Sequence, residues 1–141
     1  MMLTHTGRKS GLPRHTVLEV IRYDKPTGTC VAASGWGDRA SWFRNIQENP
    51  LVIVDIGARR IDSFAVLLSA NDAERELLSY AQRHRLSFRI LARVLGEKAG
   101  KDGREKIREI ARRGSELIPM VAFVPRVNKE APPANREQGV A

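Results

Sequence analysis

The sequence predicts an α+β fold: an antiparallel, barrel-like sheet with a short inserted helix and a later group of helices. Turn-forming residues at 24–28 and 57–60 separate apolar runs too closely for helical crossovers, which favours hairpins. Helical patterns gather in the second half of the chain. A length of 141 residues is typical of one domain. We expect this domain over residues 1–126 and a disordered, proline-containing tail over 127–141.

The pattern predicts about six strands. Residues 1–6 resemble the end of a strand whose beginning is missing, and a β-branched and aromatic run favours a strand over 14–23. The remaining strands are predicted at residues 29–34, 51–56, 61–68 and 117–124. Pro119 lies within the last run, so that strand either sits at an edge of the sheet or begins after the proline.

A short helix is predicted over residues 40–48, with Trp42, Phe43 and Ile46 on one side and an end imposed by Pro50. Asn71, with Glu74 three residues later, resembles a helix-capping box and predicts the start of the next helix. Further helices are expected over 86–95 and after Asp102, separated by a polar loop over 96–103.

A formal net charge of +8 and a pI near 10.4 favour anionic partners: nucleic acid, an acidic membrane surface or a polyanionic small molecule. The basic residues of the later helices are scattered with few aromatic residues between them, so we expect no specific nucleic-acid partner. The lone Cys30 lies in an apolar run and predicts a buried thiol in a reducing, cytoplasmic setting. We expect neither a signal peptide nor a membrane span, which leaves peripheral membrane contact open.

The sequence Thr-His-Thr-Gly-Arg-Lys-Ser-Gly-Leu-Pro-Arg at 4–14 is the first candidate site. Glycines allow a tight turn, and successive backbone N–H groups in such a turn can form an anion-binding nest. Arg8, Lys9 and Arg14 add positive charge around it. The motif therefore predicts a cationic loop that holds phosphate or carboxylate, with an ordinary basic hairpin turn as the alternative.

The second candidate site is Ser34-Gly35-Trp36-Gly37, together with Trp42 and Asn45 on the short helix. Glycines let a flat ligand approach the backbone, an indole offers a stacking surface, and an amide can both donate and accept hydrogen bonds. The alternative is that these helix residues belong to the core.

Other motifs are weaker. The sequence from Gly35 to Ala40 also matches the dinucleotide fingerprint G-x-G-x-x-A, with Asp55 twenty residues beyond, but the chain is short for a doubly wound sheet. The three histidines lack metal-ligand spacing and no carboxylate pair stands out, so we expect no metal and assign no catalytic residue. Redox chemistry would then come from a cofactor.

The two motifs in this order, followed by Trp42-Phe43-Arg44-Asn45-Ile46 and Asn49-Pro50, resemble the deazaflavin-dependent nitroreductase family. The resemblance covers residues 3–68 and 117–126. It implies a split β-barrel fold and coenzyme F-420, an 8-hydroxy-5-deazaflavin, with FMN the less favoured cofactor. The cofactor-binding residues that we expect are Arg8, Lys9, Ser10, Gly11, Arg14, Ser34, Gly35, Trp36, Gly37, Trp42 and Asn45.

The resemblance also implies hydride transfer from the reduced coenzyme to a small organic acceptor, such as a quinone or a nitroaromatic. Because only Tyr80 and Phe88 offer aromatic contacts in the segment that faces substrate in that family, the acceptor stays open. The alternative is a protein of the same fold that binds a deazaflavin or a lipid-like ligand without turnover. A monomer and a homodimer are both compatible with the sequence.

Overall fold

The computed structural model describes residues 1–35, 37–86, 108–109, 111–114 and 118–127. The elements are β1 Met2–Thr6, β2 Pro13–Val17, β3 Val20–Asp24, β4 Thr29–Ala33, η1 Gly37–Arg39, α1 Ser41–Glu48, β5 Leu51–Ile56, β6 Arg59–Leu67, α2 Ala70–Arg83 and β7 Met120–Pro125. Residues 108–109 and 111–114 are helical. The expected helix over 86–95, the loop over 96–103 and the C-terminal tail lie almost wholly outside the described residues.

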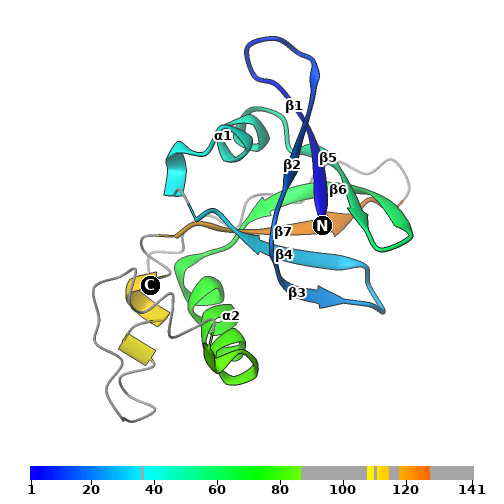
Figure 1. Ribbon diagram of the computed structural model, residues 1–141. Coiled ribbons are helices and arrows are strands. Elements are labelled where there is room, and N and C mark those ends of the chain that lie inside the picture. The colour runs from blue at the N-terminus through cyan, green and yellow to red at the C-terminus, as the bar shows by residue number, and fades with distance from the viewer. Residues whose placement is uncertain (36, 87–107, 110, 115–117, 128–141) are drawn as a thin grey trace.

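Seven strands form one sheet in the order β2-β1-β5-β6-β7-β4-β3, and every neighbouring pair is antiparallel. The two edge strands follow each other in the chain, with only Leu18 and Glu19 between them. A flat sheet of this size would separate its edges by about 29 Å. Two linking residues span at most about 11 Å. The sheet must therefore curl, and Figure 1 shows β2 leading directly into β3.

The prediction of a single strand over 14–23 is wrong, and this accounts for the seventh strand. At the break, Leu18 turns into the core and exchanges two hydrogen bonds of 3.0 Å with Met1. Leu18 N–H donates to the Met1 carbonyl, and the Met1 ammonium donates to the Leu18 carbonyl. No glycine or proline marks this bend, so the β-branched run reads as continuous in the sequence.

Two hydrophobic clusters cover the two faces of the sheet. One packs α1 residues against Leu3, Val54, Phe123 and their neighbours, and the other packs Leu77 and Tyr80 of α2 against β3, β4 and β7. Along β4 and β7, alternate residues enter different clusters, which explains their unbroken apolar runs. Figure 1 shows α1 beside the β1–β2 hairpin and α2 beside β3.

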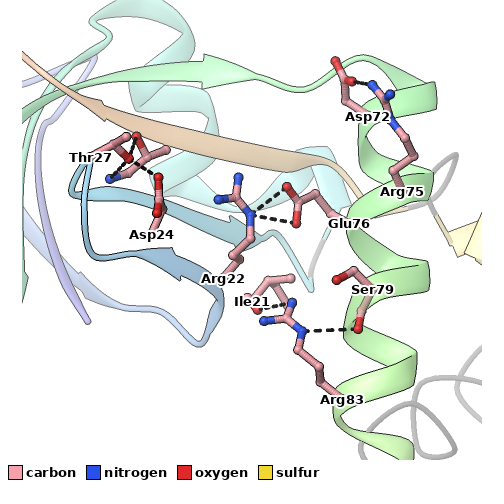
Figure 2. A network of polar contacts seen from close by, with 10 residues as sticks. Ile21, Arg22, Asp24, Thr27, Asp72, Arg75, Glu76, Ser79 and Arg83 are labelled. Carbon is pink, nitrogen blue, oxygen red and sulfur yellow. Dashed lines mark hydrogen bonds and ion pairs between the residues drawn. The ribbon is translucent and has the colours of Figure 1, made fainter.

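Polar contacts fasten α2 to β3, as Figure 2 shows. Arg22 Nε donates to both carboxylate oxygens of Glu76, at 2.9 and 3.1 Å, and Arg83 donates to the Ile21 carbonyl at 3.5 Å. The N-cap of α2 is Ser69, whose hydroxyl accepts from the Asp72 N–H. The predicted cap at Asn71 is therefore wrong, because the helix begins at Ala70.

Pro119 allowed the final strand either to lie at an edge of the sheet or to begin after the proline, and the structure shows the second arrangement. It begins at Met120, directly after the proline, and lies between β6 and β4 in the interior of the sheet. There it places Phe123 in the core beside Trp42, with ring centroids 6.4 Å apart.

Candidate functional site: a cationic groove beside the first hairpin

The loop that joins β1 to β2 is a compact, internally bonded turn. Gly7 N–H donates to the Leu12 carbonyl and Gly11 N–H donates to the Gly7 carbonyl, both at 2.8 Å. The Ser10 hydroxyl accepts from Leu12 N–H at 3.2 Å and from Arg14 Nη2 at 3.4 Å. Gly11 has a φ of 68°, which favours glycine.

Most of the loop's described N–H groups are used within the protein, so only those of Lys9 and Ser10 stay available for the predicted anion nest. The N–H groups of Gly7, Arg8, Gly11 and Leu12 all donate to acceptors within the protein.

Asn45 of α1 ties this loop to the rest of the protein. Its Oδ1 accepts from both the backbone N–H and the Nη1 of Arg8, each at 3.0 Å. Asn45 is only 5% exposed and its Oδ1 is occupied by these two bonds, although the residue also lines the groove described below. The residue orients Arg8, whose side chain is otherwise exposed.

His5 completes the network from the other side. Asn45 Nδ2 lies 3.1 Å from His5 Nδ1, and His5 Nε2 lies 3.1 Å from the Thr16 hydroxyl. Because Asn45 Oδ1 already accepts two hydrogen bonds, its Nδ2 must donate, and His5 Nδ1 must accept. The arrangement therefore requires neutral His5 with its proton on Nε2. Burial, followed by the charges of His15 and Arg14, lowers the pKa of His5, in agreement with a neutral ring.

These residues form one wall of an open groove of about 430 Å³. Its lining residues are His5, Gly7, Arg8, Lys9, Ser10, Arg14, His15, Thr16, Ser41, Trp42 and Asn45. Arg8, Lys9 and Arg14 place two guanidinium groups and an ammonium group along it, and no described residue lines it with a carboxylate. The described ion pairs involve Arg22, Arg60 and Arg75, which lie elsewhere. The groove is thus suited to an anionic ligand.

Trp42 has two roles in this geometry. It is 7% exposed and packs edge-on against Phe43, with ring centroids 5.8 Å apart. It also lines the groove, so the indole can offer only a small part of its surface to a ligand. Both interpretations of Trp42, as core residue and as groove residue, therefore apply.

The second motif contributes to the turn before η1, and its described residues Ser34, Gly35 and Gly37 are not among those that line the groove. Ser34 is fully buried; its N–H donates to the Pro119 carbonyl at 2.8 Å and its hydroxyl donates to the Gly37 carbonyl at 2.6 Å. These bonds fix the turn that leads from β4 into η1. Gly11 does not line the groove either, and Trp36 lies outside the described residues.

Of the expected cofactor-binding residues, the groove brings together Arg8, Lys9, Ser10, Arg14, Trp42 and Asn45. Sequence reasoning missed His5, Gly7, His15, Thr16 and Ser41 as lining residues. Alternation along β1 offered one signal, because His5 shares the inward face with Leu3. Tyr80 lies away from the groove, in the cluster beneath α2, and donates to Glu19 at 3.0 Å.

The antiparallel sheet rules out the dinucleotide-binding interpretation of the residues from Gly35 to Ala40, which requires parallel strands. Asp55, its expected ribose-binding acid, instead pairs with Arg60 at 3.2 Å. Among the described residues, no group of His, Cys, Asp or Glu could hold a metal ion. In the same part of the chain, no helix is long and apolar enough to cross a membrane.

Solved structures confirm the fold. A structure described as an F420-H2 dependent reductase (FDR-A) is 21% identical, with a TM-score of 0.57, and the match covers 86% of this chain and 90% of that one. A conserved hypothetical protein from Mycobacterium tuberculosis is 14% identical, with a TM-score of 0.58, over 89% of this chain and 72% of that one. A Clostridium acetobutylicum protein of the pyridoxinephosphate oxidase family is 9% identical, with a TM-score of 0.52, and the match covers 88% of this chain and 74% of that one. The expected split barrel is thus present.

A comparison with curated proteins finds no match. A family model described as F420H(2)-dependent quinone reductase matches residues 1–107, which is most of the chain. It confirms the resemblance to deazaflavin-dependent reductases and the choice of coenzyme F-420 over FMN. This chain therefore belongs to the F420H(2)-dependent quinone reductase family and is an enzyme that uses coenzyme F-420.

Proposed function

We propose that this protein transfers a hydride from reduced coenzyme F-420 to a quinone, and that the cationic groove is where it holds the coenzyme. The observation that carries the proposal is the cluster of Arg8, Lys9 and Arg14 around a groove without a lining carboxylate. The coenzyme's phosphate and oligoglutamate tail would be recognised there by charge.

The residues present fit the anionic end of the coenzyme. Arg8 is held in place by Asn45, and Arg14 donates to Ser10, so two of the guanidinium groups are partly ordered before a ligand arrives. Ordering a side chain in advance reduces the entropy lost on binding. Lys9 adds a third cation from the exposed side of the loop.

From α1, Trp42 and Ser41 would supply an apolar surface and a hydroxyl for the coenzyme's ring. The reduced deazaflavin supplies the hydride when bound. The protein contributes position, charge and exclusion of water on the side where Trp42 meets the core.

The first experiment measures coenzyme binding. Titration of the protein with F-420, followed by the coenzyme's fluorescence, should show saturable binding at micromolar concentrations. The variant Lys9→Ala/Arg14→Ala should bind about 10- to 50-fold more weakly at low salt, because two favourable charge contacts are lost. The difference should shrink as salt screens the charges.

The matched control is Lys25→Ala/Arg85→Ala, which removes the same two charges from exposed positions outside the groove lining. It should retain the parent affinity within about two-fold. Equal losses in the two double variants would mean that the overall net charge attracts the coenzyme and that the groove is not its site.

The second experiment measures turnover. Oxidation of the reduced coenzyme should accelerate on addition of a soluble naphthoquinone, and the rate with a nitroaromatic compound tests the other acceptor class. Saturable coenzyme binding with no oxidation by either acceptor would contradict the proposed reaction and favour a binding protein of the same fold.

A further inference from the structure

His5 lines the proposed coenzyme site from β1, where it is buried and pairs across the strands with Arg14. It is 4% exposed, and its two ring nitrogens are both used, one toward Asn45 and one toward Thr16. Neither the family description nor the charge pattern assigns it a role. The chain of contacts from Thr16 through His5 and Asn45 to Arg8 joins β2, β1, α1 and the loop.

We propose that His5 is a positioning residue: as a neutral hydrogen-bond acceptor it orients the Asn45 amide, which in turn holds the backbone and guanidinium of Arg8 in the groove. The inference rests on the proposed function for its consequence in coenzyme binding, but the contact chain is a property of the protein alone.

The hydrogen bond between His5 and Asn45 determines how Asn45 can bond to Arg8. Asn45 has one oxygen and one NH₂ group, and Arg8 presents only donors to it. The oxygen must therefore face Arg8 and the NH₂ group must face His5. If His5 Nδ1 gained a proton, two donors would meet across 3.1 Å. Turning the amide over would instead set its NH₂ group against the two Arg8 donors, so one of the two contacts must be lost.

The surroundings of His5 offer no acid to compensate for its protonation. From β2 it faces Arg14 and His15, and from the loop Arg8 and Lys9 line the same groove. From α1 it meets Asn45 and Trp42, and β5 presents the apolar Val52 and Val54 to the same core. The described groups that carry or can gain charge here are all basic. Protonation of His5 should therefore release the Arg8 loop.

The protonation of His5 makes coenzyme affinity depend on pH. The pKa of His5 is lowered in the folded protein, so the contact chain is intact above the ordinary histidine pKa and is lost as the pH falls through the lowered value. Coenzyme affinity should weaken by about five- to ten-fold as the pH falls from 8 through the lowered pKa of His5, since Arg8 loses its ordering contacts. His15 also lines the groove, so the measurements use a His15→Asn background, which leaves His5 as the one histidine among the described lining residues.

Three proteins in that background separate positioning from general structure. His5→Asn places an amide oxygen near the Nδ1 position and cannot titrate, so it should bind F-420 like the parent at pH 8 and keep that affinity at pH 5. His5→Leu removes the acceptor and should bind about five- to ten-fold more weakly at both pH values. Titration of the coenzyme itself is common to all three and cancels in the ratios of their dissociation constants.

A measurement without coenzyme decides the inference independently. In protein labelled with ¹⁵N, the ring nitrogen shifts of His5 should report the Nε2–H tautomer at pH 8. The Arg8 backbone amide resonance should move with the same midpoint as His5, and in His5→Asn it should stay in place. The proposal would be overturned if His5 carried its proton on Nδ1 at pH 8, or if the Arg8 amide resonance did not shift as His5 titrates. Failure of F-420 to bind any of the proteins would instead count against the proposed function.

Discussion

Gly7 and Gly35 belong to the two glycine motifs, but a side chain would meet very different surroundings at each. A Cβ built on Gly7 would lie 2.6 Å from the Ser10 hydroxyl oxygen, which is too close for real atoms, whereas its other neighbours stand at 3.4 Å or more. A Cβ on Gly35 would meet nothing within 4 Å. Neither glycine has a positive φ. Gly7 is therefore required by close packing in the loop, and Gly35 is not.

Gly7→Ala should lower the free energy of unfolding by about 1 kcal/mol, because Ser10 must move and give up its hydrogen bonds to Leu12 and Arg14. Gly35→Ala, the matched control, should change it by less than about 0.5 kcal/mol. Urea denaturation of Gly7→Ala, Ser10→Ala and the double variant completes a cycle. In the Ser10→Ala background, Gly7→Ala should cost almost nothing; a full cost there would place the conflict elsewhere.

At the residue scale, the sequence predicted which basic residues gather at the site, but it did not predict which residue holds Arg8 in place. Arg8, Lys9 and Arg14 lie within seven positions of one another, so any tight turn brings them together. Asn45 is 37 residues from Arg8, and its contact depends on where α1 packs against β1. Such a long-range hydrogen bond leaves no local pattern, which is why Asn45 was expected to contact the ligand directly.

At the scale of elements, α2 shows how a helix start can be misplaced by two residues. Ser69 and Asn71 are both good N-cap residue types. In the structure, Ser69 has the extended backbone of a cap and accepts from the Asp72 N–H, while Asn71 lies exposed within the first turn. The pattern of apolar residues located the helix correctly, since Ala73, Leu77 and Ala81 are buried.

Ser69→Ala should therefore destabilise the protein by about 1 kcal/mol, because the first turn of α2 loses its side-chain acceptor. Asn71→Ala should be neutral or slightly stabilising, because alanine is the better helix former at an exposed helical position. Chemical denaturation of the two variants side by side checks this. The reverse order would restore Asn71 as the cap.

At the scale of the whole molecule, the curl of the sheet explains why the run over residues 14–23 forms two strands and not one. The chain leaves β2 at one edge of the sheet and enters β3 at the other, so Leu18 and Glu19 bridge the two edges. Antiparallel strands and a barrel-like sheet were predictable from the hairpin turns and apolar runs. The place where one strand becomes two was not, because it is set by closure of the sheet and by no residue with special backbone preferences.

Closure makes Leu18 a core residue although it lies between two strands. It is 9% exposed and packs in the cluster that includes Phe43 and Phe123, while its neighbour Val17 is 82% exposed. Leu18→Ala should lower the free energy of unfolding by about 2–4 kcal/mol, since it opens a cavity where the edges of the sheet meet. Val17→Ala should change it by less than about 0.5 kcal/mol. Urea denaturation of both variants measures the difference, and similar values would mean that the edges do not close over Leu18.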